Sequence, residues 1–330
     1  MPPLTKPSGT RTVPTFAGDI GPDELGTTLI HEHVFVGHQE LDLNFPHPEW
    51  DEESAIEAAV EGLGRLYALG VRTVVDLTVP GLGRDAARVQ RVASRSPVNL
   101  IASTGYYTAG GLPHYFHTHR PGGPVDVPEP LEELFLRDIR EGIAGAGIRA
   151  GMLKVYSDAK GITPDDARVI GAAASAHLQT GVPITTHSDS ASRGGKSQQD
   201  LLQRLGVPLE RVIIGHAGDS PELDYLMELA DAGSTLGFDR FGMEHTAPDE
   251  QRISTLLALL QRGYADRIVL SHDAAFFSRI TPPSWRSRTV PHWHMENLHT
   301  RILPRLRACG VSEAVLETIL VHNTKRLLAG

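Results

Sequence analysis

Two short apolar runs that end in metal-ligand side chains constrain this chain more than any other feature. They are residues 29–33 (LIHEH) and residues 269–273 (VLSHD). His31 and His33 are two residues apart, so on a strand their side chains point to the same face. Imidazole is the commonest protein ligand for divalent transition metals, and a carboxylate can complete such a site. An isolated His-x-His is equally compatible with half-buried strand histidines, but similar endings recur between these two runs.

Apolar runs alternate with helical patterns along the whole chain. We expect strands at 26–36, 73–77, 100–103, 151–155, 182–186, 212–215, 234–238 and 268–271. Strands that alternate with helices form βαβ units, and eight units predict a closed (β/α)8 TIM barrel with its active site at the C-terminal mouth. An open doubly wound sheet is the alternative, but no G-x-G-x-x-G follows the first strand. We expect one domain over residues 1–330, with a loose N-terminal arm at 1–12.

Start and stop signals predict the helices between these strands. The predicted helices cover 51–69, a segment that ends at Arg95, 131–143, 163–180, 220–233, 249–261, 296–309 and 312–328. Thr163 with Pro164 and two following acids is a strong start, and Gly181 is a typical stop. A hairpin with its turn at 21–23 is expected before the first barrel strand. The loop at 109–130 is long enough to be a lid or a binding loop.

Charge and cysteine content exclude several classes of protein. The net charge of −9 argues against a nucleic-acid partner, because phosphate binding requires clustered Lys and Arg. Cys309 is the only cysteine, so no intrachain disulfide is possible and a reducing compartment fits. No apolar core of a signal peptide and no run of about 18 apolar residues is present. We therefore expect a cytoplasmic protein without a membrane partner.

Polar side chains follow every predicted strand, and in an α/β barrel these positions surround the active site. They are His31, His33, Asp76, Tyr106, Tyr107, Lys154, His187, His216, Arg240 and Asp273. Four histidines and one aspartate are enough ligands for two divalent ions. Two adjacent cations also need an anion between them.

Lys154 is the unusual member of this set, because an ammonium group would be repelled by metal ions. A salt bridge or solvent exposure is the ordinary interpretation of an isolated lysine. A desolvated lysine loses its proton readily, however, and can then add carbon dioxide to become a carbamate that bridges two metals. Both interpretations remain open from the residues alone.

Six phrases extend this pattern over residues 17–328: GTTLIHEH, TGYY, GVPITTHS, VIIGHAGDS, GFDRFG and GYADRIVLSHD. The chain resembles the amidohydrolase superfamily, and within it the phosphotriesterase family and its lactonase branch. The resemblance implies two divalent ions bridged by a hydroxide and by N6-carboxylated Lys154. It assigns His31, His33 and Asp273 to the more buried ion, and His187 and His216 to the more exposed one.

The resemblance implies a metal-dependent hydrolase that opens lactones, above all N-acyl-homoserine lactones in quorum quenching, with slow phosphotriester hydrolysis. Asp273 would transfer the proton, Tyr107 would orient the carbonyl or the hydroxide, and Arg240 would support the lactone and the loops. A phosphotriesterase or another carboxylesterase is the alternative. Zinc is the first choice of metal, with iron, cobalt or manganese open. We expect a homodimer, and a binding module on an inactive barrel would need a missing ligand, which the sequence does not show.

The segment after the last strand departs from better-known lactonases. Residues 274–278 (AAFFS) stand where bulkier or cysteine-bearing residues are expected. We predict that Phe276, Phe277 and Trp285 line an apolar substrate channel, whereas Trp293 fits a channel or loop packing equally well. Glu32 is expected to face away from the site.

Overall fold

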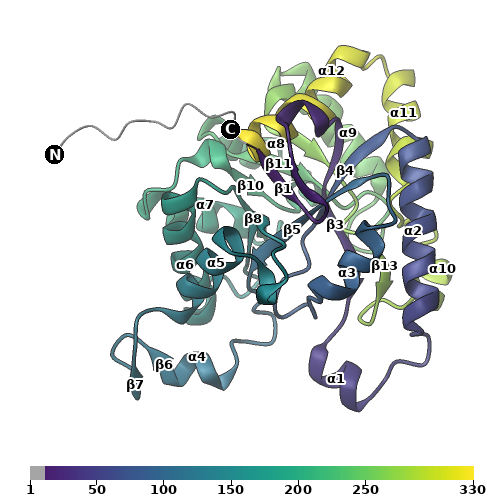
Figure 1. Ribbon diagram of the computed structural model, residues 1–330. Coiled ribbons are helices and arrows are strands. Elements are labelled where there is room, and N and C mark those ends of the chain that lie inside the picture. Colours follow the sequence, from purple (N-terminus) through teal and green to yellow (C-terminus); the bar gives the residue numbers. More distant parts are fainter. Residues whose placement is uncertain (1–11) are drawn as a thin grey trace.

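Eight parallel strands form the barrel in the computed structural model, which describes residues 12–330. The strands are β3 (Thr27–Val36), β4 (Val71–Asp76), β5 (Asn99–Gly105), β8 (Ala150–Tyr156), β9 (Ile184–His187), β10 (Val212–Ile214), β11 (Thr235–Phe238) and β12 (Ile268–Leu270). Each strand pairs in parallel with the next in this series. The predicted (β/α)8 architecture is confirmed (Figure 1). Of the predicted arm at 1–12, all but Thr12 lies outside the described residues.

The barrel closes between β3 and the residues that follow β12. The Asp273 amide donates to the His31 carbonyl at 3.0 Å, and the His33 amide donates to the Ala274 carbonyl at 2.8 Å. A further strand, β13 (Ala275–Ser278), then continues the parallel pairing with β3. The closure therefore brings His33 of β3 into contact with Asp273 after β12, although the two residues are 240 positions apart in sequence.

Helices cover the outside of the barrel (Figure 1). The longer ones are α2 (Glu52–Ala68), α3 (Ala86–Ala93), α5 (Pro130–Arg140), α6 (Pro164–Thr180), α7 (Gly194–Arg204), α8 (Leu223–Asp231) and α9 (Asp249–Gln261). The chain closes with α10 (Pro283–Thr289), α11 (Leu303–Ala308), α12 (Glu313–Glu317) and α13 (Asn323–Ala329), with π-helical turns before α11 and α13.

The predicted start and stop signals of α6 are present. Thr163 accepts from the Asp166 amide as the N-cap, and Gly181 ends the helix in the left-handed conformation, with φ of 72°. Such a conformation favours glycine because no Cβ obstructs it. Within residues 12–330, no helix combines the length and the apolar character needed to span a membrane.

Two apolar layers hold the barrel together. One lies between the sheet and the helices, and the other fills the barrel interior with Ile30, Val75, Ile101, Met152, Ile213 and Val269. Val13 and Leu327 join the interior cluster. This packed interior leaves the loops after the strands as the place for a site.

Short elements before and between the barrel strands differ from expectation: α1 (Gln39–Asn44), α7 and α10 were not predicted, and the first hairpin turns elsewhere. β1 (Val13–Thr15) and β2 (Gly18–Ile20) form the expected antiparallel hairpin, but it turns at 16–17 and not at 21–23. Gly18 has a φ of 118° and accepts from the Thr15 hydroxyl, which fixes the earlier turn. The 109–130 loop contains α4 (His114–Thr118), β6 (His119–Arg120) and β7 (Val125–Asp126), which project from the barrel body (Figure 1).

Candidate metal centre

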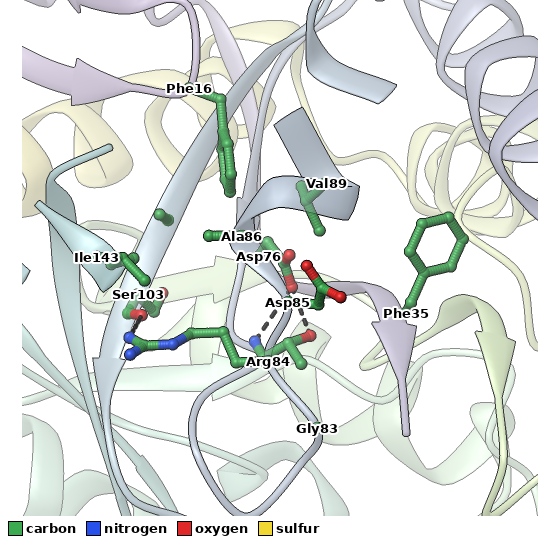
Figure 2. Close-up of a pocket in the computed structure, with 12 residues that line it drawn as sticks. Phe16, Phe35, Asp76, Gly83, Arg84, Asp85, Ala86, Val89, Ser103 and Ile143 are labelled. Atoms are coloured by element: carbon green, nitrogen blue, oxygen red, sulfur yellow. Dashed lines mark hydrogen bonds between the residues drawn. The ribbon is translucent and has the colours of Figure 1, made fainter. Parts of the chain in front are cut away.

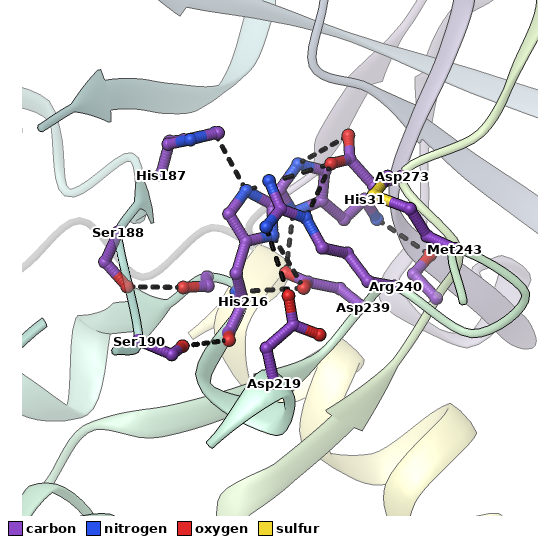
Figure 3. A network of polar contacts seen from close by, with 12 residues as sticks. His31, His187, Ser188, Ser190, His216, Asp219, Asp239, Arg240, Met243 and Asp273 are labelled. Atoms are coloured by element: carbon purple, nitrogen blue, oxygen red, sulfur yellow. Dashed lines mark hydrogen bonds and ion pairs between the residues drawn. The ribbon is translucent and has the colours of Figure 1, made fainter. Parts of the chain in front are cut away.

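The C-terminal end of the barrel gathers all the side chains predicted as metal ligands. They are His31, His33, Lys154, His187, His216 and Asp273, several of which are visible in Figure 3. Contacts of 2.9 to 3.8 Å link their nitrogen and oxygen atoms. Of these residues, His187 and Asp273 are partly exposed and the others are buried.

Asp239, which follows β11, orients two of the histidines. Its Oδ2 lies 2.7 Å from His31 Nδ1, and its Oδ1 lies 2.9 Å from His216 Nδ1 (Figure 3). A carboxylate accepts, so both Nδ1 atoms carry the proton and both Nε2 atoms carry the lone pair. The histidines hold the pKa of Asp239 well below its usual value against the opposing effect of burial. Burial in turn lowers the pKa of His216 to about 4, so the ring is neutral.

Thr78 and Asp76 orient the third histidine in the same sense. The Thr78 hydroxyl donates to Asp76 Oδ1 at 2.6 Å and lies 2.9 Å from His33 Nδ1. Since the hydroxyl has given its one proton to the carboxylate, His33 Nδ1 must donate and Nε2 carries the lone pair. Asp76 Oδ1 also accepts from the Val34 and Thr78 amides.

Asp76 itself lies behind the site and not in its ring of side chains. Figure 2 shows it near Asp85 in the lining of a cavity of about 10 Å³, which has room for about one water. Burial raises the pKa of Asp76. It acts on the site through its hydrogen bonds with Thr78 and with the Val34 amide, so its expected place at the mouth is corrected.

The arrangement of lone pairs fits bound cations. His33 Nε2 faces Asp273 Oδ1 at 3.1 Å, which places two acceptors against each other unless a cation lies between them. Ligand atoms about 2.1 Å from a tetrahedral metal are separated by roughly 3.4 Å, close to the contacts found here. His31, His33 and Asp273 form one group able to hold an ion.

A second group could also hold an ion on the basis of distance alone. It consists of His31, His216 and Asp239, whose imidazole nitrogens and carboxylate oxygens lie close together. Both Asp239 oxygens accept from imidazole N–H groups, so this carboxylate positions ligands and does not coordinate. Carboxylate–histidine pairs of this kind raise ligand basicity and fix the ring.

Lys154 is fully enclosed and forms no ion pair with any carboxylate of the described chain. Its Nζ lies 2.9 Å from His31 Nε2. Burial lowers the pKa of the amine to about 8. The salt-bridge and solvent-exposed interpretations of this lysine are therefore both excluded by the structure.

Two of the predicted ligands sit in strained backbone. His216 has a φ of 62° and Asp273 a φ of 54°, both in the left-handed region that non-glycine residues rarely adopt. Each such residue costs on the order of 1–3 kcal/mol, and such strain clusters at functional sites.

Arg240 connects the site to a chain of buried charges. Its Nε donates to Asp273 Oδ2 at 3.2 Å and its Nη1 to Asp219 Oδ2 at 3.1 Å (Figure 3). Asp219 is held in turn by Arg252 at 2.6 Å. Although burial opposes it, the pKa of Asp273 lies well below its usual value, and the Arg240 guanidinium is one of the charges that lower it. Asp273 is therefore an ionised, oriented carboxylate.

A cavity of about 250 Å³ opens onto these groups. Tyr107 lines it, as the sequence predicts, whereas Tyr106 packs edge-on against Phe116. Burial raises the pKa of Tyr107, so its phenol keeps its proton and is a donor. The outer wall comes from the loops after β4, β11 and β12, through Leu82, Met243, Ile280 and Trp293.

The predicted aromatic channel is wrong. Phe277 is buried with its ring 4.7 Å from that of Trp50, and Phe276 points at Gly62 in α2. Trp285 contacts the His245 ring at 5.4 Å and does not line the cavity. Because β13 extends the sheet past the barrel rim, its two aromatic side chains pack outside the mouth.

Sequence reasoning missed Asp239 and Thr78 and placed Asp76 in the ring at the mouth, so the orienting role of all three was not predicted. Each of these three residues follows or ends a strand. A metal-bound histidine needs a hydrogen-bond partner on its other nitrogen, and this requirement was the available signal. Glu32 faces away from the site, as predicted. Its Oε1 lies 2.6 Å from His272 Nδ1 and accepts from the Ser271 hydroxyl, which holds the segment that carries Asp273.

Known proteins share this arrangement over nearly the whole chain. The model of the phosphotriesterase family matches residues 11–328. The chain belongs to the phosphotriesterase family. Members of this family are binuclear metal-dependent enzymes, so the chain is a metal-dependent hydrolase of ester or phosphoester bonds.

Similar structures and sequences support the family assignment throughout. A phosphotriesterase structure from Mycobacterium tuberculosis is 43% identical, with a TM-score of 0.94, covering 96% of this chain and 98% of that one. An aryldialkylphosphatase of Saccharolobus solfataricus is 37% identical over 93% of this chain and 96% of its own. A mutant PTE-like lactonase from Deinococcus radiodurans is 33% identical, with a TM-score of 0.87, covering 96% of this chain and all of its own.

Proposed function

We propose that this phosphotriesterase-family protein hydrolyses lactones, with N-acyl-homoserine lactones as the preferred class and phosphotriesters as slow substrates. The observation that carries this is the polarity of the 250 Å³ cavity. Its inner end is polar, with Lys154, His187 and Asp273, and its outer wall includes Ile280 and Trp293. An acylated lactone would place its polar ring at the inner end and its aliphatic chain against the outer wall. Similarity to a PTE-like lactonase also supports the proposal.

Each polar group of the cavity has a role in ring opening. Two divalent ions held by the six ligands would polarise the carbonyl and lower the pKa of a bound water. Asp273 accepts the proton of the attacking water and delivers it to the ring oxygen as the ester bond breaks. Arg240 holds Asp273 in place through the 3.2 Å contact. The Tyr107 phenol donates to the substrate carbonyl oxygen.

Lys154 is proposed to be N6-carboxylated. A neutral amine adds carbon dioxide and releases a proton, which leaves an anion for the two cations to share. The burial of the amine and its lowered pKa support this step. Zinc is the metal we propose, because neutral imidazole and carboxylate ligands suit it; iron, cobalt or manganese would also suit this ligand set.

The carbamate can be tested without an activity assay. Metal-free protein would be reconstituted with zinc and ¹³C-labelled bicarbonate, and a carbamate resonance sought by ¹³C NMR. We expect the resonance in wild type and in Lys160→Ala, a control at an exposed lysine, and its absence in Lys154→Ala. A resonance that survives in Lys154→Ala would reject the assignment.

Substrate preference requires a direct comparison of kcat/KM. An N-acyl-homoserine lactone, an unsubstituted lactone, an aryl carboxylester and an aryl phosphotriester would be assayed with the zinc-loaded protein. We expect the acylated lactone to be hydrolysed fastest. A higher kcat/KM for the phosphotriester or the carboxylester would instead support the alternative, in which that activity is the main one.

We further propose a cytoplasmic homodimer that acts in quorum quenching. An exposed, free Cys309 suits a reducing compartment. Leu43 and Phe45, at the end of α1 (Gln39–Asn44) and just after it, are 83% and 71% exposed, and such apolar surface commonly marks an interface. Light scattering at working concentration would test the dimer: we expect the mass of two chains, and the mass of one chain would reject it.

A further inference from the structure

A second cavity lies outside the metal centre, behind β13. It has a volume of about 260 Å³ and is enclosed by α2, β13 and the segment from α10 to residue 296. Its walls are largely apolar and include Leu66, Phe276, Val290, Trp293 and Met295. Ala275 and Trp293 also line the metal-site cavity, so the two cavities share a wall.

Arg286 of α10 lines this cavity and is 8% exposed. Its guanidinium donates to the backbone carbonyls of Ala275 and Phe276. Its Nε has no acceptor, and no carboxylate of the described residues forms an ion pair with it. Burial alone lowers its pKa, to about 10. Arg286 is therefore a buried cation without a counter-charge.

Other buried arginines of this protein are paired. Arg252 contacts Asp219 at 2.6 Å and Asp249 at 3.0 Å, and Arg240 contacts Asp219 and Asp273. An uncompensated buried charge is costly, and buried charges in proteins are normally paired or bound to a ligand. Arg286 has the Trp293 ring, 5.8 Å from its guanidinium carbon, and two backbone carbonyls as partners, but no anion. The contrast with the paired arginines indicates that the missing anion comes from a bound molecule.

The remaining charges around the cavity do not fill this role. Glu296 lines the cavity, but its carboxylate is bound by Arg65, which donates to it at 2.8 Å. His294 adds no negative charge. The cavity thus combines one unpaired cation with apolar walls, and it has no free acid among the described residues.

We propose that this cavity binds a small apolar carboxylic acid as its carboxylate. The acid group would accept from the Arg286 guanidinium, whose planar fork matches a carboxylate. The aliphatic or aromatic part would lie against Phe276, Trp293 and Leu66. The proposal concerns residues outside the metal centre and does not rest on the lactonase assignment.

A fluorinated acid tests the site directly. We would titrate 6,6,6-trifluorohexanoate into zinc-loaded protein and follow bound ¹⁹F resonances, because the acid can also reach the metal centre and the two sites give separate signals. We expect one signal whose affinity falls more than about 10-fold in Arg286→Gln, with metal content unchanged. Arg288→Gln removes an exposed arginine of the same helix and should leave the signal intact. The neutral amide of the same acid should not produce it.

A second variant keeps the test decisive if Arg286→Gln folds poorly. Ser287→Phe places a large side chain at the exposed rim of the cavity and retains Arg286, so it should also abolish this signal. The proposal is overturned if the only bound signal is displaced by a lactone and persists in both Arg286→Gln and Ser287→Phe. It is equally overturned if zinc-loaded wild type gives no bound signal.

Discussion

The inner and outer halves of the metal centre are held in different ways. The inner half consists of His31, His33 and His216, the last of which is assigned to the more exposed ion. In each of these histidines the nitrogen that faces away from the site is bonded to Asp239 or Thr78. In the outer half, the polar side-chain atoms of His187 and Lys154 contact only other ligands of the site. The protein thus positions the inner half by itself, whereas the outer half depends on whatever binds between these groups.

This difference explains why the inner histidines are ready to bind a cation. Their Nε2 lone pairs already converge, since the orienting groups fix both tautomer and ring angle. Asp273 acts on both halves, because its Oδ1 faces the inner histidines and its charge also acts on Lys154 and His187 of the outer half. Variants that act on one half and spare the other therefore test the account.

Asp273→Asn should have the largest effect, because it removes the charge that both halves share. We expect kcat to fall by roughly 10³-fold and bound metal to decrease, since one residue supplies a ligand and the proton acceptor. Activity assays and elemental analysis of the purified variant would measure both. Normal metal content with normal kcat would remove Asp273 from the site.

Asp239→Asn should loosen two histidines of the inner half, one assigned to each ion. Losing the carboxylate that fixes two histidines is expected to weaken metal affinity or activity by about 10–100-fold. Competition with a metal chelator would measure the affinity. Asp224→Asn, at an exposed position of α8, is the matched control and should behave as wild type. An unchanged affinity in Asp239→Asn would mean that the metals, not the carboxylate, orient the inner histidines.

The pH dependence of stability in metal-free protein should show the inner half directly. The pKa of His216 is about 4 in the folded chain and about 6.5 in an unfolded one, so the unfolded state binds more protons between these values. Stability must then fall as pH decreases from about 6.5 to 4. His216→Asn should reduce this slope by up to about 1.4 kcal/mol per pH unit. Urea denaturation at several pH values would measure it, and identical slopes would contradict the neutral, buried ring.

Phe277→Ala should have the smallest effect on the site. Phe277 packs on Trp50 outside the mouth, so its loss is expected to lower the free energy of unfolding by about 3–5 kcal/mol. Preference among acyl-chain lengths should stay as in wild type. Ile280→Ala, which alters the cavity wall, is the comparison expected to change that preference. A changed preference in Phe277→Ala alone would restore the channel role predicted from the sequence.

The gathering of the candidate ligands could be predicted from the sequence because parallel strands end at one rim. An apolar run that stops at a histidine places that histidine at the rim whatever the details of packing. Orienting contacts were harder, since Asp239 next to Arg240 looks like any charged pair after a strand. Its role depends on two histidines from β3 and β10 reaching it, which only the closed barrel reveals.

Two sequence-based predictions were wrong because the local sequence carries no clear signal for the structure that forms. α7 was not predicted because it begins with Gly194 and Gly195 and its N-cap, Arg193, makes no side-chain cap contact. Phe276 and Phe277 were assigned to the mouth because they follow Asp273 closely. Pairing of β13 with β3 turns them toward α2 and Trp50, and nothing in four residues of sequence indicates that pairing.

Anomalous diffraction from zinc-loaded crystals would locate each ion of the proposed binuclear centre. We expect two peaks about 3.5–4 Å apart. One should lie among His31, His33 and Asp273, the other beside His187 and His216, with Lys154 between them. Both Asp239 oxygens should remain on the Nδ1 atoms of His31 and His216. A peak within about 2.2 Å of an Asp239 oxygen, or a single peak among the His31, His216 and Asp239 group, would contradict the account.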